Sequence, residues 1–200
     1  MLSFLCHSRA KRRIPIRVWF GNHNTRSDRI HTPERNFTMP IQIRRATEAD
    51  IPELSRLVAA LAAWEQSLDP RVQFDWDGIR DAPNWLKLVL NRGHHAVWVA
   101  DAGDSRLVGH LWIRLKHQDD GALPQSIGFI SQAFMDEAFR GRGLMKPMLE
   151  AAYEWFRDAG ITVITLSVLH RNWVGATAWH RLGFSDWREE RRMDLKPRPK

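Results

Sequence analysis

A turn with two glycines, set between an apolar segment and an amphipathic helix, constrains this chain more than any other feature. Residues 127–135 are apolar and predict a buried strand, and residues 140–146 read Arg-Gly-Arg-Gly-Leu-Met-Lys. Apolar residues then recur at the three- and four-residue spacing of a helix (Met145, Met148, Leu149, Ala152 and Phe156). Such a turn places unpartnered N–H groups at the positive end of a helix dipole, which favours a phosphate. A basic strand–helix connection without a ligand is the alternative interpretation.

Two motifs in this half of the chain resemble those of a known family. Arg140-x-x-Gly143 is similar to the pyrophosphate-binding signature of the GNAT superfamily of N-acetyltransferases, which reads Arg or Gln, two residues, Gly, one residue, then Gly or Ala. Further on, Asn172 begins a stretch that ends in Trp179, three residues and Gly183-Phe184, and this stretch resembles the family's second signature. The motifs have the family's order and separation, and the resemblance covers roughly residues 41–196.

The resemblance implies a fold and a co-substrate. The fold is α/β (α+β), with a mixed, twisted sheet of six to seven strands that is splayed at its centre and about four helices. The co-substrate is acetyl-coenzyme A, and the reaction is acetyl transfer to a primary amine of a small molecule or peptide by direct attack in a ternary complex. The residues expected to bind the cofactor are Ala133, Phe134, Met135, Arg140, Gly141, Arg142, Gly143, Leu144, Met145, Lys146, Asn172 and Trp179.

The region between Trp64 and Trp85 has no clear period and combines acids, aromatic residues and a proline. In the family this region forms a wall of the acceptor site. Aromatic rings beside carboxylates suit a cationic amine, so we expect Asp69, Arg71, Phe74 and Trp76 to bind substrate. The alternative is that the rings fill the core and the aspartates are solvated.

Three departures from the family pattern affect the chemistry. Met145 replaces the second Gly or Ala of the signature, Trp179 stands where the family often has a tyrosine that protonates the thiolate, and no carboxylate occurs from Gly121 to Met135. The catalytic residues are therefore unknown, with Asp120, His110 and Trp179 as candidates. An acceptor amine of low pKa would need little assistance, and a thiol of pKa about 8.5 can leave without a protein acid. The alternative function is a catalytically inactive, coenzyme A-binding regulatory module.

Composition restricts the setting. Of the 30 Lys and Arg residues, eight lie in residues 1–38 with two of the 23 acids, which leaves a nearly balanced 22 and 21 for the rest. We therefore expect a basic, disordered extension (1–38) and a single N-acetyltransferase domain (39–200), with no nucleic-acid or membrane partner and no metal. One cysteine excludes an intrachain disulfide and favours a cytoplasmic protein. A homodimer is compatible with the sequence.

Patterns elsewhere predict the remaining elements. Residues 41–45 alternate as a strand does, and Thr47 with two nearby acids begins a helix. Two strands, 95–100 and 106–116, form a hairpin, and a short helix covers about 84–91. A β-branched run at 161–168 and a final segment at 184–195 predict the last two strands.

Overall fold

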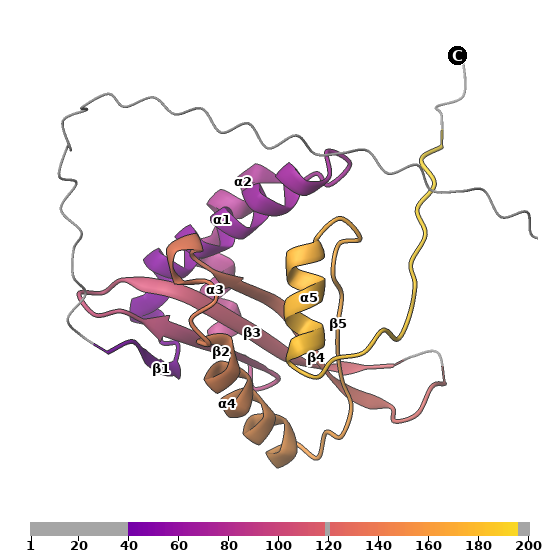
Figure 1. Ribbon diagram of the computed structural model, residues 1–200. Helices are drawn as coiled ribbons and strands as arrows, with labels where there is room; N and C mark the ends of the chain where they lie inside the picture. Colours follow the sequence, from indigo (N-terminus) through magenta and orange to yellow (C-terminus); the bar gives the residue numbers. More distant parts are fainter. Residues whose placement is uncertain (1–39, 119–120, 196–200) are drawn as a thin grey trace, which may run out of the picture. The chain divides into compact units, whose positions relative to one another are not determined.

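The computed structural model describes residues 40–118 and 121–195 (Figure 1). The predicted basic extension, residues 1–38, and the candidate Asp120 lie outside the described residues. The division into an extension and one acetyltransferase domain stays a prediction.

A mixed sheet forms the centre of the described fold. Its five strands are β1 (Gln42–Arg45), β2 (His95–Asp101), β3 (Leu107–His117), β4 (Ser126–Met135) and β5 (Ile164–Leu166), in the spatial order β1-β2-β3-β4-β5. Neighbouring strands are antiparallel except β4 and β5, which are parallel and therefore need a crossover. The predicted mixed α/β fold is confirmed.

Helices cover both faces of this sheet (Figure 1). On one face lie α1 (Ile51–Leu68) and α3 (Ala82–Leu90), which share a core with the side chains of Val97, Val99 and Phe134, and α2 (Trp76–Arg80) precedes α3. On the other face lies the crossover helix α4 (Met145–Asp158). The last helix, α5 (Trp173–Arg181), runs beside β5.

The predicted stripe of α4 is the part that is buried. Met148, Leu149, Ala152 and Phe156 are each at most 2% exposed, while the helix presents charged side chains on its other side. This spacing puts the apolar side chains on one face of the helix, so their burial against the sheet fixes how the helix is turned. The position of the glycine turn that precedes α4 follows from this packing.

Two predicted strands differ from the structure. The described residues contain five strands rather than six or seven, because residues 184–195 form no strand. The strand predicted at 161–168 is present but shorter, as β5 covers only Ile164–Leu166. Thr162 and Val163 are exposed, so they lack the cover on both faces that the β-branched run predicted. In the last segment Trp187, Met193 and Leu195 are exposed and do not pack against the described core.

Among the described residues there are five α-helices rather than about four, since the segment that lacked a period contains α2. Asp75 begins this helix by accepting a hydrogen bond of 3.1 Å from the backbone N–H of Asp77. Such a cap satisfies an N–H group that the helix itself leaves free. The helix expected at about 84–91 begins two residues earlier, as α3, with Pro83 in its first turn, where a proline is tolerated.

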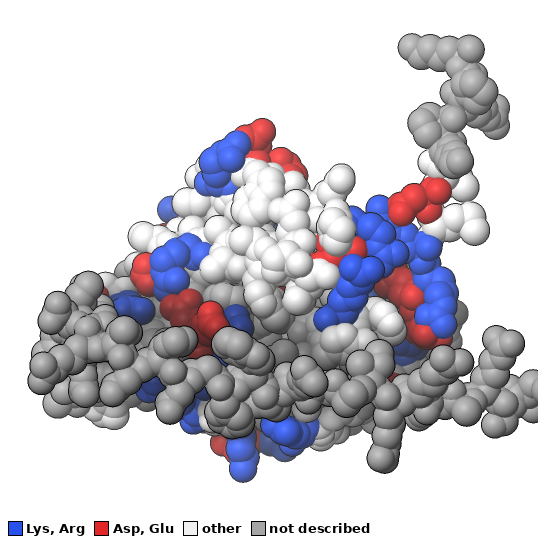
Figure 2. All heavy atoms as spheres, turned by 45° about the horizontal axis from the view of Figure 1, so that its top comes forward, with Lys and Arg blue, Asp and Glu red and all other residues white. Residues whose placement is uncertain are grey.

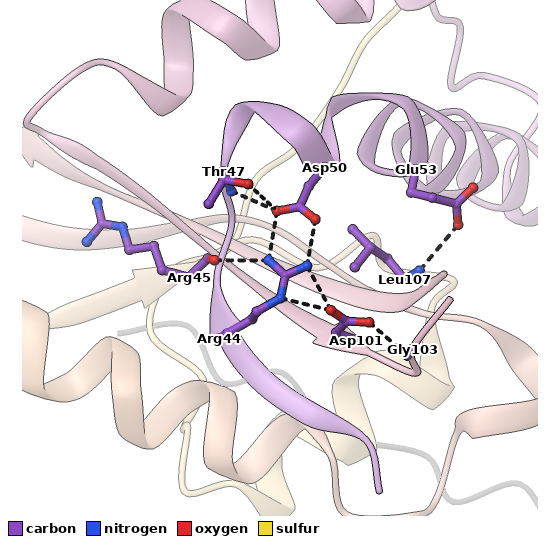
Figure 3. Close-up of polar contacts among 8 residues, drawn as sticks. All are labelled: Arg44, Arg45, Thr47, Asp50, Glu53, Asp101, Gly103 and Leu107. Atoms are coloured by element: carbon purple, nitrogen blue, oxygen red, sulfur yellow. Dashed lines mark hydrogen bonds and ion pairs between the residues drawn. The ribbon is translucent and has the colours of Figure 1, made fainter. Parts of the chain in front are cut away.

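A polar network fixes the start of α1 to the edge of the sheet (Figure 3). The guanidinium of Arg44 on β1 donates to both carboxylate oxygens of Asp50, at 2.8 and 2.7 Å, and to Asp101 at the end of β2, at 2.8 Å. Asp50 also accepts from the backbone N–H of Thr47 at 2.7 Å. Arg44 therefore joins two strands to the turn that begins α1.

The ion pair predicts a pH-dependent stability. The hydrogen bonds from Arg44 lower the pKa of Asp50, so its contribution is complete above the unfolded-state pKa of about 3.9 and is lost as the pH falls through the lower folded-state value. We expect Asp50→Asn to lower the free energy of unfolding by about 2 kcal/mol at pH 7, because hydrogen bonds between charged groups contribute about that much. Urea unfolding at pH 7 and pH 3 measures both effects. Equal losses for Asp50→Asn and the exposed Asp158→Asn at pH 7 would contradict the prediction.

Charges of both signs lie on the surface. Figure 2 shows one face on which Lys and Arg side chains lie next to Asp and Glu side chains around a broad uncharged area. This mixture agrees with the near balance of acids and bases outside residues 1–38. Among the described residues, none of the helices has the length and apolar character needed to cross a membrane.

Candidate active site

The turn between β4 and α4 exposes a row of backbone N–H groups. Gly141 and Gly143 have φ of 73° and 76°, the left-handed region that favours glycine. Within the described chain, the N–H groups from Gly141 to Met145 donate no hydrogen bond, and the first that does is that of Lys146, to the Gly143 carbonyl at 3.2 Å. A Cβ on either glycine would meet nothing within 4 Å, so the turn is open. The free donors and the dipole of this 14-residue helix make an anion site.

The two arginines of the turn differ in what their side chains do. Arg140 donates from Nε to the carbonyl oxygen of Met135 at 3.0 Å, and its guanidinium lies 5.2 Å from the ring of Trp64 and 5.6 Å from that of Phe134. Its side chain therefore ties the turn to β4 and α1. Arg142 and Lys146 are exposed beside the free N–H groups. Leu144 and Met145 pack against the core, as predicted for Met145.

Beside this turn, β4 has an edge with no strand partner. β5 pairs only with Gly128–Ile130, so no strand of the described chain pairs with β4 from Ser131 to Met135 on the side away from β3. A bulge leaves Ser131 without a partner on β3 as well. Peptide-like groups can therefore bind this edge by adding to the sheet. The edge contains Ala133, Phe134 and Met135, which the family resemblance predicts to bind the cofactor.

The second motif forms α5, which runs beside β5. Asn172 accepts a hydrogen bond of 2.7 Å from the N–H of Gly175 through its side-chain oxygen and caps α5. Trp179 packs edge-on against Phe184, with ring centroids 5.3 Å apart, and belongs to the border of the core around α4. Trp179 therefore has a packing role in the structure, and its indole N–H has no useful acidity.

α1 and the residue that follows it contact β3, the turn after β4 and the segment after β5. Arg56 donates 2.6 Å to the Leu107 carbonyl at the start of β3. Trp64 lies under Arg140, and Asp69, just beyond the helix, is 3.7 Å from Nε of Arg171, which follows β5. The helix thus extends from the start of β3, past the turn that follows β4, to the segment that follows β5. It forms one wall of the candidate site.

The predicted acceptor residues lie at the end of that wall. Asp69 is buried, and both its oxygens accept from Arg71, at 2.5–3.2 Å. The hydrogen bonds from Arg71 hold the pKa of Asp69 far below its usual range, so its charge is compensated within the protein. Phe74 and Trp76 meet edge-on, with ring centroids 6.5 Å apart.

His110 lies beneath the unpaired part of β4. It is 1% exposed, and its Nε2 is 3.2 Å from Oε1 of Gln132. Its Nδ1 is buried without a partner in the described chain. Burial lowers the pKa of His110 to about 4, so the ring is neutral near pH 7. The Gln132 oxygen can only accept, which places the ring proton on Nε2.

The sequence analysis missed one carboxylate in this wall. Glu65 lies on α1 between Trp64 and Asp69, and its side chain makes no hydrogen bond or ion pair with a described residue. Burial raises the pKa of Glu65, which is the property of a group that accepts protons readily. Its helical spacing from the buried Val58 and Leu61 was the available signal.

These features fit the groups of acetyl-coenzyme A. A diphosphate matches the free N–H groups from Gly141 to Met145 and the adjacent cations, and an amide-containing arm matches the free edge of β4. The free edge of β4 and the glycine turn are close together in the chain, since only a 3-10 turn (Glu137–Phe139) separates them. The described residues contain no group of three or more His, Cys, Asp or Glu that could hold a metal ion.

Comparisons with known proteins agree with this site. The family model described as the acetyltransferase (GNAT) family matches residues 54–184. An aminoglycoside N(6')-acetyltransferase type 1 of Stenotrophomonas maltophilia is 29% identical over 119 residues, which are 59% of this chain and 69% of that protein.

Two solved structures share the fold. The aminoglycoside N-acetyltransferase AAC(6')-Iy in complex with CoA has a TM-score of 0.58 at 20% identity, over 78% of this chain and 99% of that one. A predicted acetyltransferase of Clostridium acetobutylicum with acetyl-CoA has a TM-score of 0.62 at 18% identity, over 78% and 97%. The chain therefore belongs to the acetyltransferase (GNAT) family and is an N-acetyltransferase with acetyl-coenzyme A as its co-substrate.

Proposed function

We propose that this enzyme acetylates a primary amine of a small molecule or peptide by direct attack of the neutral amine on the thioester in a ternary complex. The amine nitrogen forms a bond to the acetyl carbon, the bond from that carbon to sulfur breaks, and the amine gives up a proton. One observation carries the proposal: the free N–H groups from Gly141 to Met145 follow the unpaired edge of β4 after only a short 3-10 turn. This arrangement would hold a long co-substrate at two places and would direct its acyl end toward α1.

The chain's own residues would bind and orient the co-substrate, which supplies an activated acetyl group. The N–H groups of the glycine turn, with Arg142 and Lys146, would bind the diphosphate. The backbone of Ala133, Phe134 and Met135 would orient the arm that carries the thioester, and a free N–H on this edge would stabilise the negative charge that develops on the carbonyl oxygen. Asn172 would keep α5 in place beside the arm.

The transfer is tested by incubating the protein with acetyl-coenzyme A and a panel of primary amines. The panel should hold amino acids, peptides and an aminoglycoside, since relatives of this chain are named for aminoglycoside acetylation. We expect free thiol to appear together with an acetylated amine, detected by mass spectrometry. If acetyl-coenzyme A binds but no amine in the panel is acetylated, the proposed acceptor class is wrong.

We propose that Glu65 takes the proton that the amine loses, directly or through water. Direct proton transfer by a positioned side chain accelerates a reaction by about 100-fold or more. Because relay through water makes this contribution smaller, we expect Glu65→Gln to lower kcat/KM by about tenfold. The acetyl-coenzyme A affinity should stay unchanged. Steady-state kinetics with calorimetry measures both, and Glu154→Gln, on the exposed side of α4, is the control. Unchanged kcat/KM in Glu65→Gln would remove this assignment.

A further inference from the structure

A groove on the α3 side of the sheet adjoins the unpaired part of β4. Its volume is about 530 Å³. Its lining includes Trp112 and Arg114 of β3, Gln132 of β4, and Arg92 and His94, which follow α3. Gln132 directly precedes Ala133, where the edge proposed for the thioester arm begins. Successive residues of a strand are about 3.3 Å apart, so an occupant of the groove lies within reach of that edge.

The charge of this groove is positive. The charge comes from Arg92 and Arg114, and no Asp or Glu is among the lining residues. Neither Arg92 nor Arg114 forms an ion pair with a described residue, whereas Arg44, Arg56 and Arg71 all do. The guanidinium of Arg114 lies 5.2 Å from the ring of Phe129, which supports it without neutralising it.

The uncharged lining groups are also donors. Trp112 donates from Nε1 to Nδ1 of His95 at 2.9 Å, which leaves the ring proton of the neutral His95 on Nε2. Burial, together with the nearby His94, Arg114 and Arg92, lowers the pKa of His95 to about 4, so the ring is neutral near pH 7. The side-chain oxygen of Gln132 is engaged by His110, and its amide N–H₂ remains to donate.

The floor of the groove is rigid. The ring of Trp112 stacks on Trp85 of α3, with centroids 5.7 Å apart and an angle of 23° between the planes. Trp85 is fixed in turn by a hydrogen bond of 3.1 Å to the Gly78 carbonyl. A rigid set of donors without a carboxylate binds an oxyanion at low entropic cost. The same set repels a second positive charge on an acceptor.

We propose that this groove binds a carboxylate of the acceptor, so that the enzyme prefers amines that carry a carboxylate, such as amino acids and short peptides, to polycationic amines. The inference rests on the proposed transfer to a primary amine and narrows its acceptor class. Arg114 and Arg92 supply the charge, Gln132 and His95 supply neutral donors, and Trp112 with Phe129 supplies apolar surface for the rest of the molecule.

Binding of product analogues tests the groove without requiring turnover. A panel of N-acetylated amino acids is titrated into the protein with coenzyme A present, each beside its primary amide, which has the same shape and no charge. We expect the best carboxylate to bind about tenfold more tightly than its amide, a difference of about 1.4 kcal/mol. In the variants Arg114→Gln and Arg92→Gln, the carboxylate and its amide should differ less in affinity. Arg157→Gln, an exposed arginine paired with Glu154 on α4, is the control and should keep the preference.

The outcomes separate the inference from the function on which it rests. Equal binding of acid and amide throughout the panel, or no binding of any member while coenzyme A binds, overturns the carboxylate site. Acetyl transfer to the free amino acids is measured separately. If a carboxylate analogue binds and no amine is acetylated, the groove stands and the proposed transfer to this acceptor class fails. Acetylation of an aminoglycoside in preference to every amino acid overturns the acceptor preference.

Discussion

Replacing Gly143 by glutamate is expected to weaken acetyl-coenzyme A binding at least about 100-fold, which corresponds to about 2.7 kcal/mol. The new carboxylate would stand among the free N–H groups that we assign to the diphosphate. Like charges about 4 Å apart near a protein surface repel by about 4 kcal/mol. A Cβ at this position meets nothing within 4 Å, so the side chain itself causes no clash and the fold should persist.

The left-handed backbone of Gly143 needs its own control, because any L-residue there costs about 1–2 kcal/mol. Gly160 supplies it: its φ is 71°, a Cβ there also meets nothing within 4 Å, and it lies just beyond the other end of α4. Gly160→Glu should therefore lose similar stability and keep its affinity for acetyl-coenzyme A. Calorimetric titration and urea unfolding of both variants separate strain from charge. Unchanged affinity in Gly143→Glu would refute the assignment of the diphosphate to this turn.

The sequence predicted well those parts of the site that depend on local patterns. The glycine turn, the stripe of α4 and the cap of α5 by Asn172 lie where the two motifs indicated. Each depends on residues within a few positions of one another, so spacing alone carries the information. The packing of Met145 was predictable for the same reason, since it continues the stripe of α4.

The parts that failed or stayed open depend on contacts between distant segments. No local pattern shows that the Arg140 side chain stacks on Trp64 of α1, or that Arg171 shares Asp69 with Arg71. The first contact ties the glycine turn to α1, and the second adds to the compensation of the Asp69 charge. Binding of substrate by Asp69 stays a prediction. The final strand failed because alternating residues pair only when a partner edge covers them, and Trp187 and Met193 are exposed.

Glu65 shows that some nonlocal information was within reach of the sequence. The central strand has no carboxylate, whereas the apolar stripe of α1 includes Glu65. A carboxylate on a stripe that should be buried is unusual, because burial of an unpaired charge is unfavourable. Its presence there is a better indicator of a functional group than proximity in sequence to the glycine turn.

The substitution Phe156→Ala is expected to lower the free energy of unfolding by about 3–5 kcal/mol, because it removes a buried ring and leaves a cavity. Phe156 is 1% exposed and fastens α4 to the sheet. It packs where β4 has Gly128, on which a Cβ would lie 2.7 Å from two carbons of the ring. A side chain on residue 128 therefore competes with the ring for one space.

That competition predicts non-additive changes in stability. Gly128→Ala alone should lose about 1–3 kcal/mol through overpacking, whereas in a Phe156→Leu background the methyl group has room and should lose much less. Because residues in contact couple by about 0.5–3 kcal/mol, a double-mutant cycle by urea unfolding measures the effect. Additive losses would mean that the ring moves aside freely and that α4 is held by Met148 and Leu149 instead.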